Sequence, residues 1–511
     1  MRIGWKGLSM STYLLGIDVG TSACKVALFN EDGAVQAQAL SEYPVYYPHP
    51  GWAEQKPEDW WTGVSKAIRE TLNQSSVQPE DIAGIGVDGQ SWSAVATDQQ
   101  GNALCNTPIW TDTRARTECD EIRSRVPEQE LFSLCGNPVQ PSYTLPKILW
   151  YKNHLPDVYR KTAYILQSNS FIVQRLTGAF TQDISQGYGL CCFDMKQAKW
   201  DLPMAKRVGI RPELLPKLYP CHAVVGRVTR EAAAITGLAE GTPVVAGGLD
   251  AACGTLGAGV SEPGETQEQG GQAGGMSLCI DHYAADPRLI LSFHVATGRW
   301  LLQGGTTGGG GALKWLRENI CPELSFAQMS ELAETVPAGS DGVIFLPYMA
   351  GERSPIWNPN ASGVFFGLNY ARTRAHLIRA VMEGVGYALR HNLETAESAG
   401  AIAGTLRAMG GSANSEVWTQ LKADITGRRI EVPASDTATT LGAAILAGVG
   451  AGVYPNFKAA TARTVAVKRT HEPDLAKKDV YQNGYKVYRE LYQRLAPMMA
   501  EKADPIKEDE Q

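Results

Sequence analysis

The chain lacks the sequence motifs of several common enzyme classes. The 511 residues contain no Walker sequence GxxxxGK[ST], and no GxGxxG opens a helix after the first predicted strand, so the key residues of P-loop and Rossmann nucleotide sites are missing. HExxH and the GxSxG nucleophile elbow are absent as well, and these motifs carry the catalytic groups of zinc proteases and α/β-hydrolases. Any nucleotide site in this chain must therefore be of another kind.

Clustered cysteines, basic stripes and long apolar runs are also missing. Ten cysteines are spread over the chain without a CxxC spacing, which excludes a small disulfide framework and a zinc ribbon and favours a reducing cytoplasm. The formal net charge is −6 with scattered Lys and Arg, so the basic footprint of a nucleic-acid-binding protein is lacking. No stretch approaches the roughly 18 consecutive apolar residues of a membrane-spanning helix. We therefore expect a cytoplasmic protein that binds neither nucleic acid nor membrane.

The composition that is present, 44% hydrophobic and 20% charged residues, is typical of a soluble globular protein of two to four domains. In the first half, apolar periodicity predicts a helix at 57–74 and strands at 13–19, 25–30, 34–42 and 82–87. In the second half, an apolar strand again leads into glycines, an aspartate and small residues at 243–260, and long helices are predicted at 373–398, 415–426 and 440–450. The two halves thus predict an α/β fold of two domains, each a mixed sheet flanked by helices.

The domain boundary is predicted near residue 246, which gives domains of 12–245 and 246–495. Met10 is the expected natural start, so residues 1–11 are a leader. Residues 496–511 are charged and free of aromatic side chains, which is typical of a frayed tail.

Glycine is abundant, with 53 residues, and it gathers at turns beside apolar strands or at helix starts. The four clusters are GGLDAACG (247–254), GGQAGG (270–275), GGTTGGGG (304–311) and MGGSANSE (409–416). Residues without a Cβ let the backbone approach a ligand closely, and exposed backbone N–H groups bind phosphate oxygens. Together the four turns indicate a polyphosphate ligand, although any single one is equally explained as a tight turn.

The segment LLGIDVGTSACKVALFN, residues 14–30, places Asp18 at the end of an aliphatic strand. The turn that follows leads into a second strand, which predicts a hairpin whose tip offers backbone N–H groups, two hydroxyls and the Lys25 amine. Asp18 itself repels phosphate, but it is suited to hold a hydrated Mg²⁺ ion, because Mg²⁺ keeps several waters and often takes only one or two carboxylates.

Five segments carry a family resemblance: GIDVGTSACK, GGLDAACG, FLPYMAGERSPIWNPNASGVFFGL, RAVMEGVGYAL and GGSANSEVWTQLKADITGRRIEVP. In this order they resemble the FGGY family of carbohydrate kinases over residues 12–495, and within it the xylulokinases. The resemblance implies an actin-like, duplicated ribonuclease-H-like fold in which ATP and a sugar meet in a cleft between two domains. It also implies Mg²⁺ and transfer of the terminal phosphoryl of ATP to a sugar or polyol hydroxyl.

By this resemblance Asp250 is the catalytic base and Asp18 faces Mg·ATP. Phosphoryl transfer has a loose transition state, so the enzyme mainly aligns the acceptor hydroxyl, neutralises charge and takes the proton late. An aspartate of ordinary pKa, about 3.9, suffices for that role. The residues around Asp250 alone are also explained by a helix N-cap.

The resemblance also implies where the nucleotide binds. GGSANSE is similar to the family's adenine and ribose loop, GGTTGGGG is expected to line the phosphates, and Gln272 stands where the family commonly has a threonine near the terminal phosphate. The nucleotide and phosphate contacts expected in this way are Gly20, Thr21, Ser22, Lys25, Gln272, Gly309, Gly310, Gly410, Gly411 and Asn414. The turns of the second half are also explained as entries to amphipathic helices.

Sugar contacts are expected from Gln90, Ser91, Trp92, Asp112 and Asp250. Xylulokinases usually carry Met-His after the Gly-Gln that ends GVDGQ, whereas this chain has Ser91 and Trp92. An indole offers a flat apolar face for stacking and one N–H donor, with a core aromatic as the alternative. Asp112 matches the family's Trp-x-Asp-x-Arg segment, and an ion pair with Arg114 or Arg116 explains it equally.

The acceptor expected first is D-xylulose, giving D-xylulose 5-phosphate, with another ketose or a polyol of the ribulose, erythritol or glycerol type as alternatives. A non-catalytic sugar sensor on the same scaffold is expected to lack Asp250 or to carry a DNA-binding segment, and an actin-like chaperone ATPase is expected to carry a substrate-binding domain. Neither pattern is evident in the sequence. The expected partners are ATP and a small-molecule sugar, and a homodimer is an option.

Overall fold

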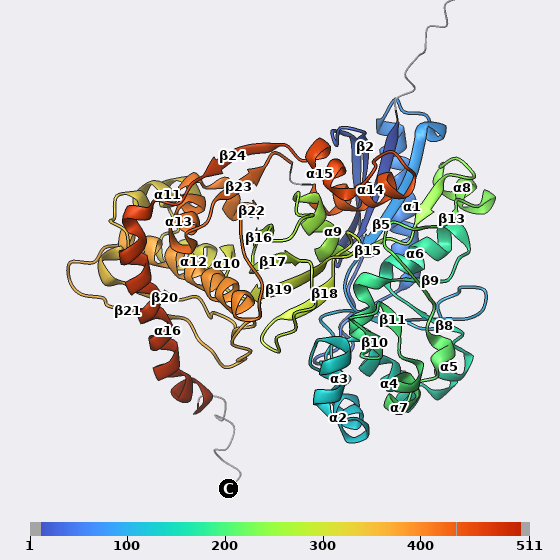
Figure 1. The fold of residues 1–511 in the computed structure, drawn as a ribbon, viewed down its shortest axis with the longest axis horizontal. Coiled ribbons are helices and arrows are strands. Elements are labelled where there is room, and N and C mark those ends of the chain that lie inside the picture. Colours follow the sequence, from blue (N-terminus) through green and yellow to red (C-terminus); the bar gives the residue numbers. More distant parts are fainter. Residues whose placement is uncertain (1–11, 436, 502–511) are drawn as a thin grey trace, which may run out of the picture. The chain divides into compact units, whose positions relative to one another are not determined.

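The computed structural model describes residues 12–435 and 437–501, so the predicted leader and Met10 lie outside the described residues. The described chain divides into two compact units (Figure 1). Unit 1 consists of residues 12–261, 292–300 and 437–465, and unit 2 of residues 262–291, 301–435 and 466–501. Each unit is built on one large mixed sheet, which confirms the predicted fold class.

The sheet of unit 1 has seven strands. In sheet order they are β13 (Val224–Arg227), β14 (Pro243–Val245), β5 (Ile82–Gly89), β1 (Tyr13–Val19), β2 (Ala23–Asn30) and β3 (Val35–Glu42), with β15 (Gly248–Leu249) also paired to β5. Strands β1, β2 and β3 form the predicted antiparallel meander, and β5 adds parallel to β1. Strands β14 and β15 both run parallel to β5, so the carboxyl ends of four strands, β1, β5, β14 and β15, point the same way.

Eleven of the described helices belong to unit 1. They are α1 (Pro57–Gln74), α2 (Arg116–Arg125), α3 (Glu128–Cys135), α4 (Thr144–His154), α5 (Pro156–Lys161), α6 (Ser168–Thr177), α7 (Leu202–Val208), α8 (Arg230–Thr236), α9 (Asp250–Gly257), α14 (Ala438–Gly450) and α15 (Phe457–Thr464). Helix α1 has the predicted bounds, because Pro57 suits the first turn and the buried Trp60, Val64 and Ile68 recur on one face.

Helix α14 packs on β1 and β5, although it comes near the end of the chain (Figure 1). Glycines permit the contact: a Cβ built on Gly16 would lie 1.9 Å from the Thr440 carbonyl oxygen, and one on Gly86 would lie 1.9 Å from that of Ala443. Any larger residue at these two positions would push the helix away from the strands. Helix α14 therefore packs directly on the backbone of the sheet.

Unit 2 repeats the strand pattern of unit 1. In sheet order its strands are β18 (Ile290–Phe293), β19 (Trp300–Thr306), β17 (Gly274–Ile280), β16 (Thr266–Gly270), β22 (Leu406–Met409), β23 (Ile430–Pro433) and β24 (Val467–His471). Strand β16 corresponds to β1 of unit 1. It pairs antiparallel with the next strand, β17, and parallel with the later strand β22, as β1 pairs with β2 and β5. The helices of this unit are α10 (Gly310–Ile320), α11 (Phe326–Glu334), α12 (Arg374–Ser398), α13 (Glu416–Thr426) and α16 (Lys478–Glu501).

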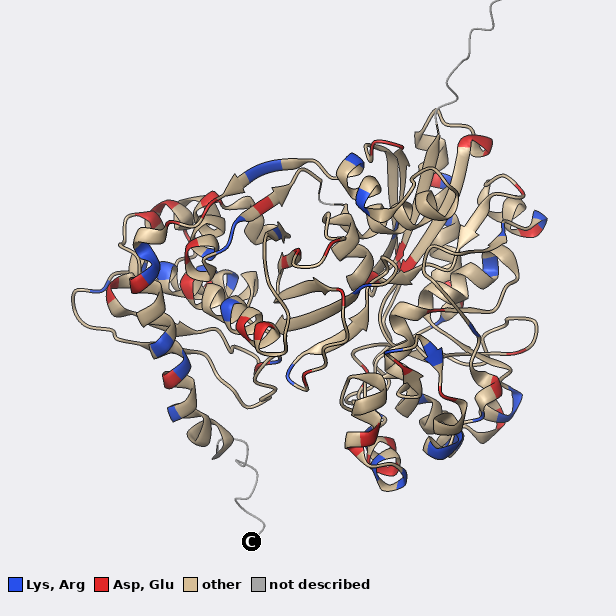
Figure 2. Ribbon diagram, viewed as in Figure 1, with Lys and Arg blue, Asp and Glu red and all other residues tan. Residues whose placement is uncertain are grey.

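Five two-stranded ribbons complete the described strands. They are β4 (Glu54–Gln55) with β7 (Thr107–Pro108), β6 (Val95–Thr97) with β8 (Tyr164–Leu166), β9 (Thr181–Asp183) with β12 (Lys217–Tyr219), β10 (Phe193–Asp194) with β11 (Lys199–Trp200), and β20 (Ile344–Leu346) with β21 (Val364–Phe366). In the described part of the chain, Lys and Arg are interspersed with Asp and Glu over both units (Figure 2).

The division into units differs from the predicted boundary near residue 246. Residues 246–261 belong to unit 1, because Gly248 and Leu249 pair with β5 and α9 packs on α14. Residues 437–465 return to unit 1 through the contact of α14 with β1 and β5. A contact between segments so far apart in sequence leaves no trace in local patterns.

The predicted tail also begins too early. Residues 496–501 continue helix α16, in spite of Pro497. Met499 is buried in the core of unit 2 together with Tyr485 and Tyr488 of the same helix, and this packing offsets the hydrogen bond that proline removes. The remaining predicted tail, 502–511, lies outside the described residues.

Candidate active site

Two aspartates stand side by side on the sheet of unit 1. Asp18 on β1 is the register partner of Asp88 on parallel β5 and of Lys25 on antiparallel β2. Gly248 of β15 is the partner of Asp88 on its other side. Register partners project to the same face of a sheet. Lys25, Asp18 and Asp88 therefore form one row near the strand ends. The row lies on the sheet face that packs against α14, because each aspartate follows by two residues a glycine that contacts this helix, and residues two apart in a strand share a face.

Asp250 joins this row from the start of α9. Its Oδ1 accepts the backbone N–H of Ala251 at 2.6 Å, and the N-cap of the helix is Leu249, so the N-cap interpretation of Asp250 is wrong. The sequence argument assigned Asp18 and Asp250 to separate domains. The structure corrects this, because β15 joins the sheet of unit 1 and brings Asp250 close enough to Asp18 and Asp88 for their charges to interact.

Burial raises the pKa of all three carboxyl groups, and neighbouring carboxylates raise the pKa of Asp88 and of Asp250 further. The pKa of Asp250 rises to about 7, first through burial and then through the charge of Asp18. The pKa of Asp18 rises to about 6, because burial outweighs the attraction of Lys25. Burial and the charges of Asp18 and Asp250 raise the pKa of Asp88 well above its ordinary value. An ordinary pKa would suffice for the role expected of Asp250, and the raised pKa of about 7 suits a general base at neutral pH.

Asp88 is the residue of this cluster that sequence reasoning missed. It is 0% exposed, and its carboxyl group forms a side-chain hydrogen bond with that of Asp18. The signal that singled out Asp18, one aspartate near the end of an otherwise apolar strand, is also present in IAGIGVDG of β5. What the sequence does not show is that the two strands are neighbours in register.

The hairpin between β1 and β2 has the predicted form. The Gly20 N–H donates to the Ala23 carbonyl at 3.1 Å, and the Tyr43 hydroxyl donates to the Gly20 carbonyl at 2.6 Å. Ser22 and Lys25 are exposed, so the hydroxyl and the amine are accessible to a phosphate. The Thr21 hydroxyl is held from the side by the Trp110 indole N–H, which donates to it at 2.9 Å.

The buried side chain of Gln90 holds this hairpin through hydrogen bonds to Gln55 and Thr21. Its Nε2 donates to Gln55 Oε1 at 2.7 Å, and its Oε1 accepts the Thr21 hydroxyl at 3.5 Å. Gln55 Nε2 in turn donates to the Thr21 carbonyl at 2.8 Å. Since Gln90 is 0% exposed, its amide orients the hairpin, and the predicted direct sugar contact of Gln90 has no support in this arrangement.

Ser91 and Trp92 follow directly after β5. Ser91 is half-buried, whereas Trp92 is 7% exposed and packs on Tyr143 and Tyr188 with ring centroids 4.7 and 6.0 Å away. The structure therefore favours the core-aromatic interpretation of Trp92 over stacking on a sugar. Its indole N–H has no hydrogen-bond partner among the described residues, and a sugar contact through that one donor stays a prediction.

Asp112 is committed to a buried ion pair. Its Oδ2 accepts the Ala53 N–H and the Arg114 Nη2, both at 2.7 Å, and its Oδ1 accepts the Arg114 backbone N–H at 3.0 Å. Arg114 also pairs with Glu54 at 2.7 Å. Asp112 is 0% exposed. The ion pair that the sequence also allowed is therefore present, and a sugar contact of Asp112 stays a prediction.

Three of the glycine clusters meet in unit 2 around the turn between β16 and β17. A Cβ on Gly309 would lie 2.4 Å from the Ala273 carbonyl carbon, and one on Gly410, where φ is +83°, would lie 3.0 Å from the carbonyl carbon of Gly270. This turn therefore lies between the start of α10 and the 3-10 turn Gly411–Asn414. The structure thus brings the predicted nucleotide residues of the second half together.

Not all of these residues are available to a ligand. The N–H of Gly310 donates to the Gly271 carbonyl at 2.7 Å, so it is not free to bind phosphate as predicted. Gln272, Gly411 and Asn414 are exposed, and a Cβ on Gly411 would meet nothing within 4 Å. The open side of the turn is therefore the side of Gly411 and Asn414.

A buried ion pair that sequence reasoning missed supports this turn. Lys422 of α13 donates to Glu268 of β16 at 2.6 Å and to the Ser412 hydroxyl at 2.8 Å. The side chains of the ion pair are 1% and 4% exposed. Because Ser412 lies directly against Gly270, Lys422 ties the strand to the glycine turn.

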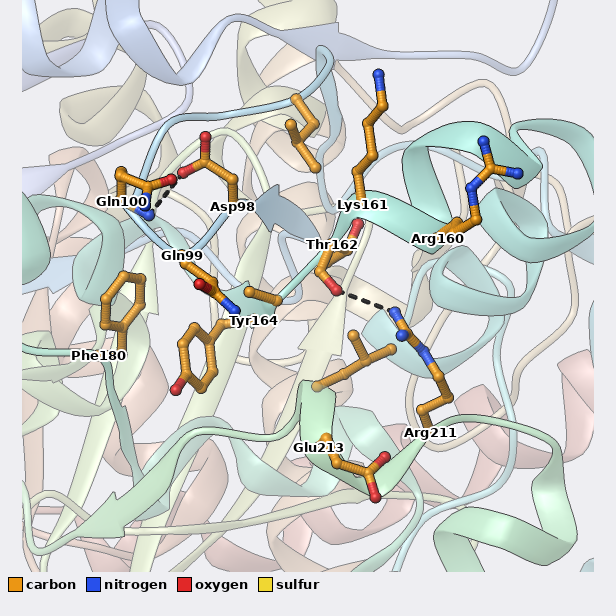
Figure 3. A pocket seen from close by; sticks show the side chains of 13 residues that line it. Asp98, Gln99, Gln100, Arg160, Lys161, Thr162, Tyr164, Phe180, Arg211 and Glu213 are labelled. Atoms are coloured by element: carbon orange, nitrogen blue, oxygen red, sulfur yellow. Dashed lines mark hydrogen bonds between the residues drawn. The ribbon is translucent and has the colours of Figure 1, made fainter.

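An open cavity of about 860 Å³ lies elsewhere in unit 1 (Figure 3). Its lining includes Gln99, Tyr164 and Phe180, and Arg211 donates to the Thr162 carbonyl at 2.9 Å on one side. None of the predicted site residues lines this cavity. The carboxylate row, not this cavity, marks the candidate site of unit 1.

Family models match both parts of the chain. Residues 13–257 match the N-terminal domain of the FGGY family of carbohydrate kinases, and residues 286–451 match its C-terminal domain. The chain belongs to this family. It is therefore a carbohydrate kinase, a phosphotransferase with an alcohol group as acceptor, and the resemblance inferred from the sequence is confirmed.

Different relatives of this chain are named after different substrates. The xylulose kinase of Bacillus subtilis (strain 168) is 32% identical over 94% of this chain and 96% of its own length. The gluconokinase of the same organism is 31% identical over 88% of this chain and 90% of its own length. The crystal structure of xylulose kinase from Rhodospirillum rubrum has a TM-score of 0.90 at 32% identity and covers 96% of this chain and 100% of that one, which confirms the actin-like fold.

Two further findings bear on the earlier expectations. All ten cysteines are free, as expected. Among the described residues, no helix combines the length and the apolar character needed to cross a bilayer.

Proposed function

We propose that this kinase transfers the terminal phosphoryl of ATP to D-xylulose and gives D-xylulose 5-phosphate. The observation that carries the proposal is the position of Asp250, a carboxylate of pKa about 7, beside the row of Asp18 and Asp88. Such a cluster combines a base for the acceptor hydroxyl with carboxylates suited to a magnesium ion. The names of several relatives support the choice of sugar.

Asp250 accepts the proton of the attacking hydroxyl in this proposal. The Ala251 N–H holds its Oδ1 and so fixes the direction of the carboxylate, while Oδ2 stays available to the acceptor. Lys25 and Ser22, exposed at the hairpin tip, contact the phosphates. When bound, Mg²⁺ neutralises charge on the phosphate oxygens as the phosphoryl group is transferred.

The nucleotide is proposed to bind at the glycine turn of unit 2. Gly411 and Asn414 leave the backbone open on one side of the turn, which suits the close approach of a base and ribose. The Lys422 ion pair keeps the turn rigid from the opposite side.

A neutral ketose fits the sugar side better than an aldonate. The carboxylate of an aldonate needs a cation as its partner. The two cations next to the segment after β5 and next to Asp112 are Lys147 and Arg114, and both already have partners within the protein. Lys147 is 0% exposed and donates to the carbonyls of Trp92 and Ile109 at 2.9 and 2.8 Å, and Arg114 is paired with Asp112 and Glu54. This favours D-xylulose over gluconate, the substrate in the name of other relatives.

A coupled ADP-release assay tests the proposal. D-xylulose, D-ribulose, L-ribulose, D-gluconate, erythritol and glycerol are compared by kcat/KM, and the position of the phosphate in the product is read by NMR. We expect the highest kcat/KM with D-xylulose and phosphorylation at its 5-hydroxyl. A higher kcat/KM for gluconate or a polyol would replace the substrate, and binding of sugar without ADP release would favour the sensor alternative.

A further inference from the structure

A buried polar network of unit 1 has no part in the proposed function so far. Its centre is Asp183, the last residue of β9. Oδ1 of Asp183 accepts the Ser185 hydroxyl and the backbone N–H groups of Ser185 and Gln186, the last two at 3.0 and 3.2 Å, and Oδ2 accepts Asn169 Nδ2 at 3.0 Å. All four residues are 0% exposed, so none of their side chains contacts a substrate, and any effect on the reaction must pass through other residues.

Ser185 connects this network to the start of α9. Its Oγ donates to Asp183 and accepts the backbone N–H of Leu249 at 2.9 Å. Leu249 is 1% exposed and precedes Asp250 directly, so water cannot replace this bond. Because the hydroxyl proton is committed to the Asp183 carboxylate, a lone pair of the oxygen is left for Leu249, and both bonds have a fixed direction.

The same network holds the segment after β5. Gln186 Nε2 donates to Asn169 Oδ1 at 2.9 Å, and Gln186 Oε1 accepts the backbone N–H of Trp92 at 3.3 Å. Trp92 has φ +55°, in the left-handed region that a bulky residue adopts only when its surroundings impose it. The start of α9 and the segment expected to face the sugar are therefore anchored to one aspartate.

The backbone of Asp250 depends on an anchor of this kind. The carboxylate accepts the N–H of Ala251, which is the next residue and moves together with it. Strand β15 pairs with β5 through only two residues, Gly248 and Leu249. A general base must lie within about 2.6–3.2 Å of the hydroxyl that it deprotonates, and a displacement of about 1 Å can lower a rate by about 100-fold. The bond from Leu249 to Ser185 therefore acts at the point where the position of the base is decided.

We propose that Ser185, oriented by Asp183, is a positioning residue for the phosphoryl transfer. It fixes the backbone from which Asp250 projects, and Gln186 fixes the segment after β5 relative to the same carboxylate. The inference rests on the proposed role of Asp250 as the base.

A double-mutant cycle in the full chain tests this role. The variants are Ser185→Ala, Asp250→Asn and the double variant, and kcat and both KM values are measured with the best sugar of the ADP-release panel. Ser185→Ala should lower kcat by about 10- to 100-fold and leave the KM for Mg·ATP unchanged. In the Asp250→Asn background the same change should alter the residual kcat by less than about twofold, because no base is left to position.

Thr236→Val is the matched control. The Thr236 hydroxyl is also 0% exposed, donates to the Ala232 carbonyl at 2.7 Å and accepts the Leu238 N–H at 3.3 Å, but it belongs to α8. Loss of this hydroxyl should lower the thermal midpoint and leave kcat unchanged, which separates positioning from general loss of stability.

The possible outcomes separate this inference from the function on which it rests. If Ser185→Ala does not fold, Ser185→Cys replaces it, since a thiol is a weaker acceptor of similar shape. A kcat within about twofold of the wild type in the folded Ser185 variant, or an equal loss in both backgrounds, would overturn the positioning role alone. Wild-type kcat in Asp250→Asn would overturn the base itself and with it this inference.

Discussion

The pKa of Asp250 leads to a quantitative prediction for the pH dependence of catalysis. A general base acts in its ionised form, and kcat/KM follows the ionisation of the free enzyme. With a pKa of about 7, the ionised fraction of Asp250 rises from about 0.09 at pH 6 to about 0.9 at pH 8, so kcat/KM should rise about tenfold over this range. An aspartate of ordinary pKa would give a flat profile over the same interval.

The Asp250→Asn variant completes this test. The amide keeps the size of the side chain and an oxygen for the Ala251 N–H, but it cannot take a proton, so kcat should fall by about 10²- to 10⁴-fold while sugar binding persists. The assay is coupled ADP release at saturating Mg·ATP from pH 5.5 to 8.5, with sugar binding measured by calorimetry. A flat profile in the wild type, or a variant with more than a tenth of the wild-type kcat, would refute Asp250 as a base of raised pKa.

Three further changes test how buried charges and close packing stabilise the two units. Lys422→Met leaves the buried carboxylate of Glu268 unpaired, so the free energy of unfolding measured by urea denaturation should fall by about 3–5 kcal/mol. An unchanged urea midpoint would contradict a structural role for this ion pair. Burial raises the pKa of Glu352 from 4.5 to about 7. Between these pH values the folded protein keeps a proton on Glu352 that the unfolded chain loses, so the free energy of unfolding of the wild type should fall by about 3 kcal/mol as the pH rises from 4.5 to about 7. Glu352→Gln should remove this pH dependence, and an equal pH dependence in both proteins would exclude Glu352 as its source. Gly86→Ala puts a Cβ 1.9 Å from the Ala443 carbonyl oxygen and should cost about 1–3 kcal/mol of stability, measured by thermal unfolding; a wild-type midpoint would show that α14 can shift at no cost.

Much of the fold follows from local sequence patterns. Helix α1 and the β1–β2–β3 meander have the predicted positions, because Pro57, the apolar period of the helix and the alternation of the strands all act over a few residues. The five segments that resemble the FGGY family are likewise local, and the family models confirm that resemblance. These features need no knowledge of which strands become neighbours.

The errors arise where distant segments meet. The boundary at residue 246 is too early because β15 pairs with β5, and Asp88 was overlooked because its partnership with Asp18 is a matter of sheet register. The motif around Asp112 fitted a sugar contact and an ion pair equally well. The structure shows the ion pair with Arg114 and a hydrogen bond from the Ala53 N–H, and the sugar contact stays a prediction. Burial and partner choice at these positions are decided by tertiary packing, which a single sequence does not display.

The duplicated architecture explains why the two units carry different chemistry. In unit 1, the parallel pair β1 and β5 ends with Asp18 opposite Asp88, and the strands lead into the phosphate hairpin and the Ser91 turn. In unit 2, the corresponding parallel pair β16 and β22 places Gln269 opposite Met409, and both strands lead into glycine turns. Corresponding strand ends thus carry two carboxylates in unit 1, whereas in unit 2 they carry an amide and a thioether and are followed by glycine turns. Carboxylates suit a cation and a proton, and glycine backbone suits close contact with a nucleotide. This difference is the physical basis for proposing the proton and cation chemistry in unit 1 and the nucleotide base in unit 2.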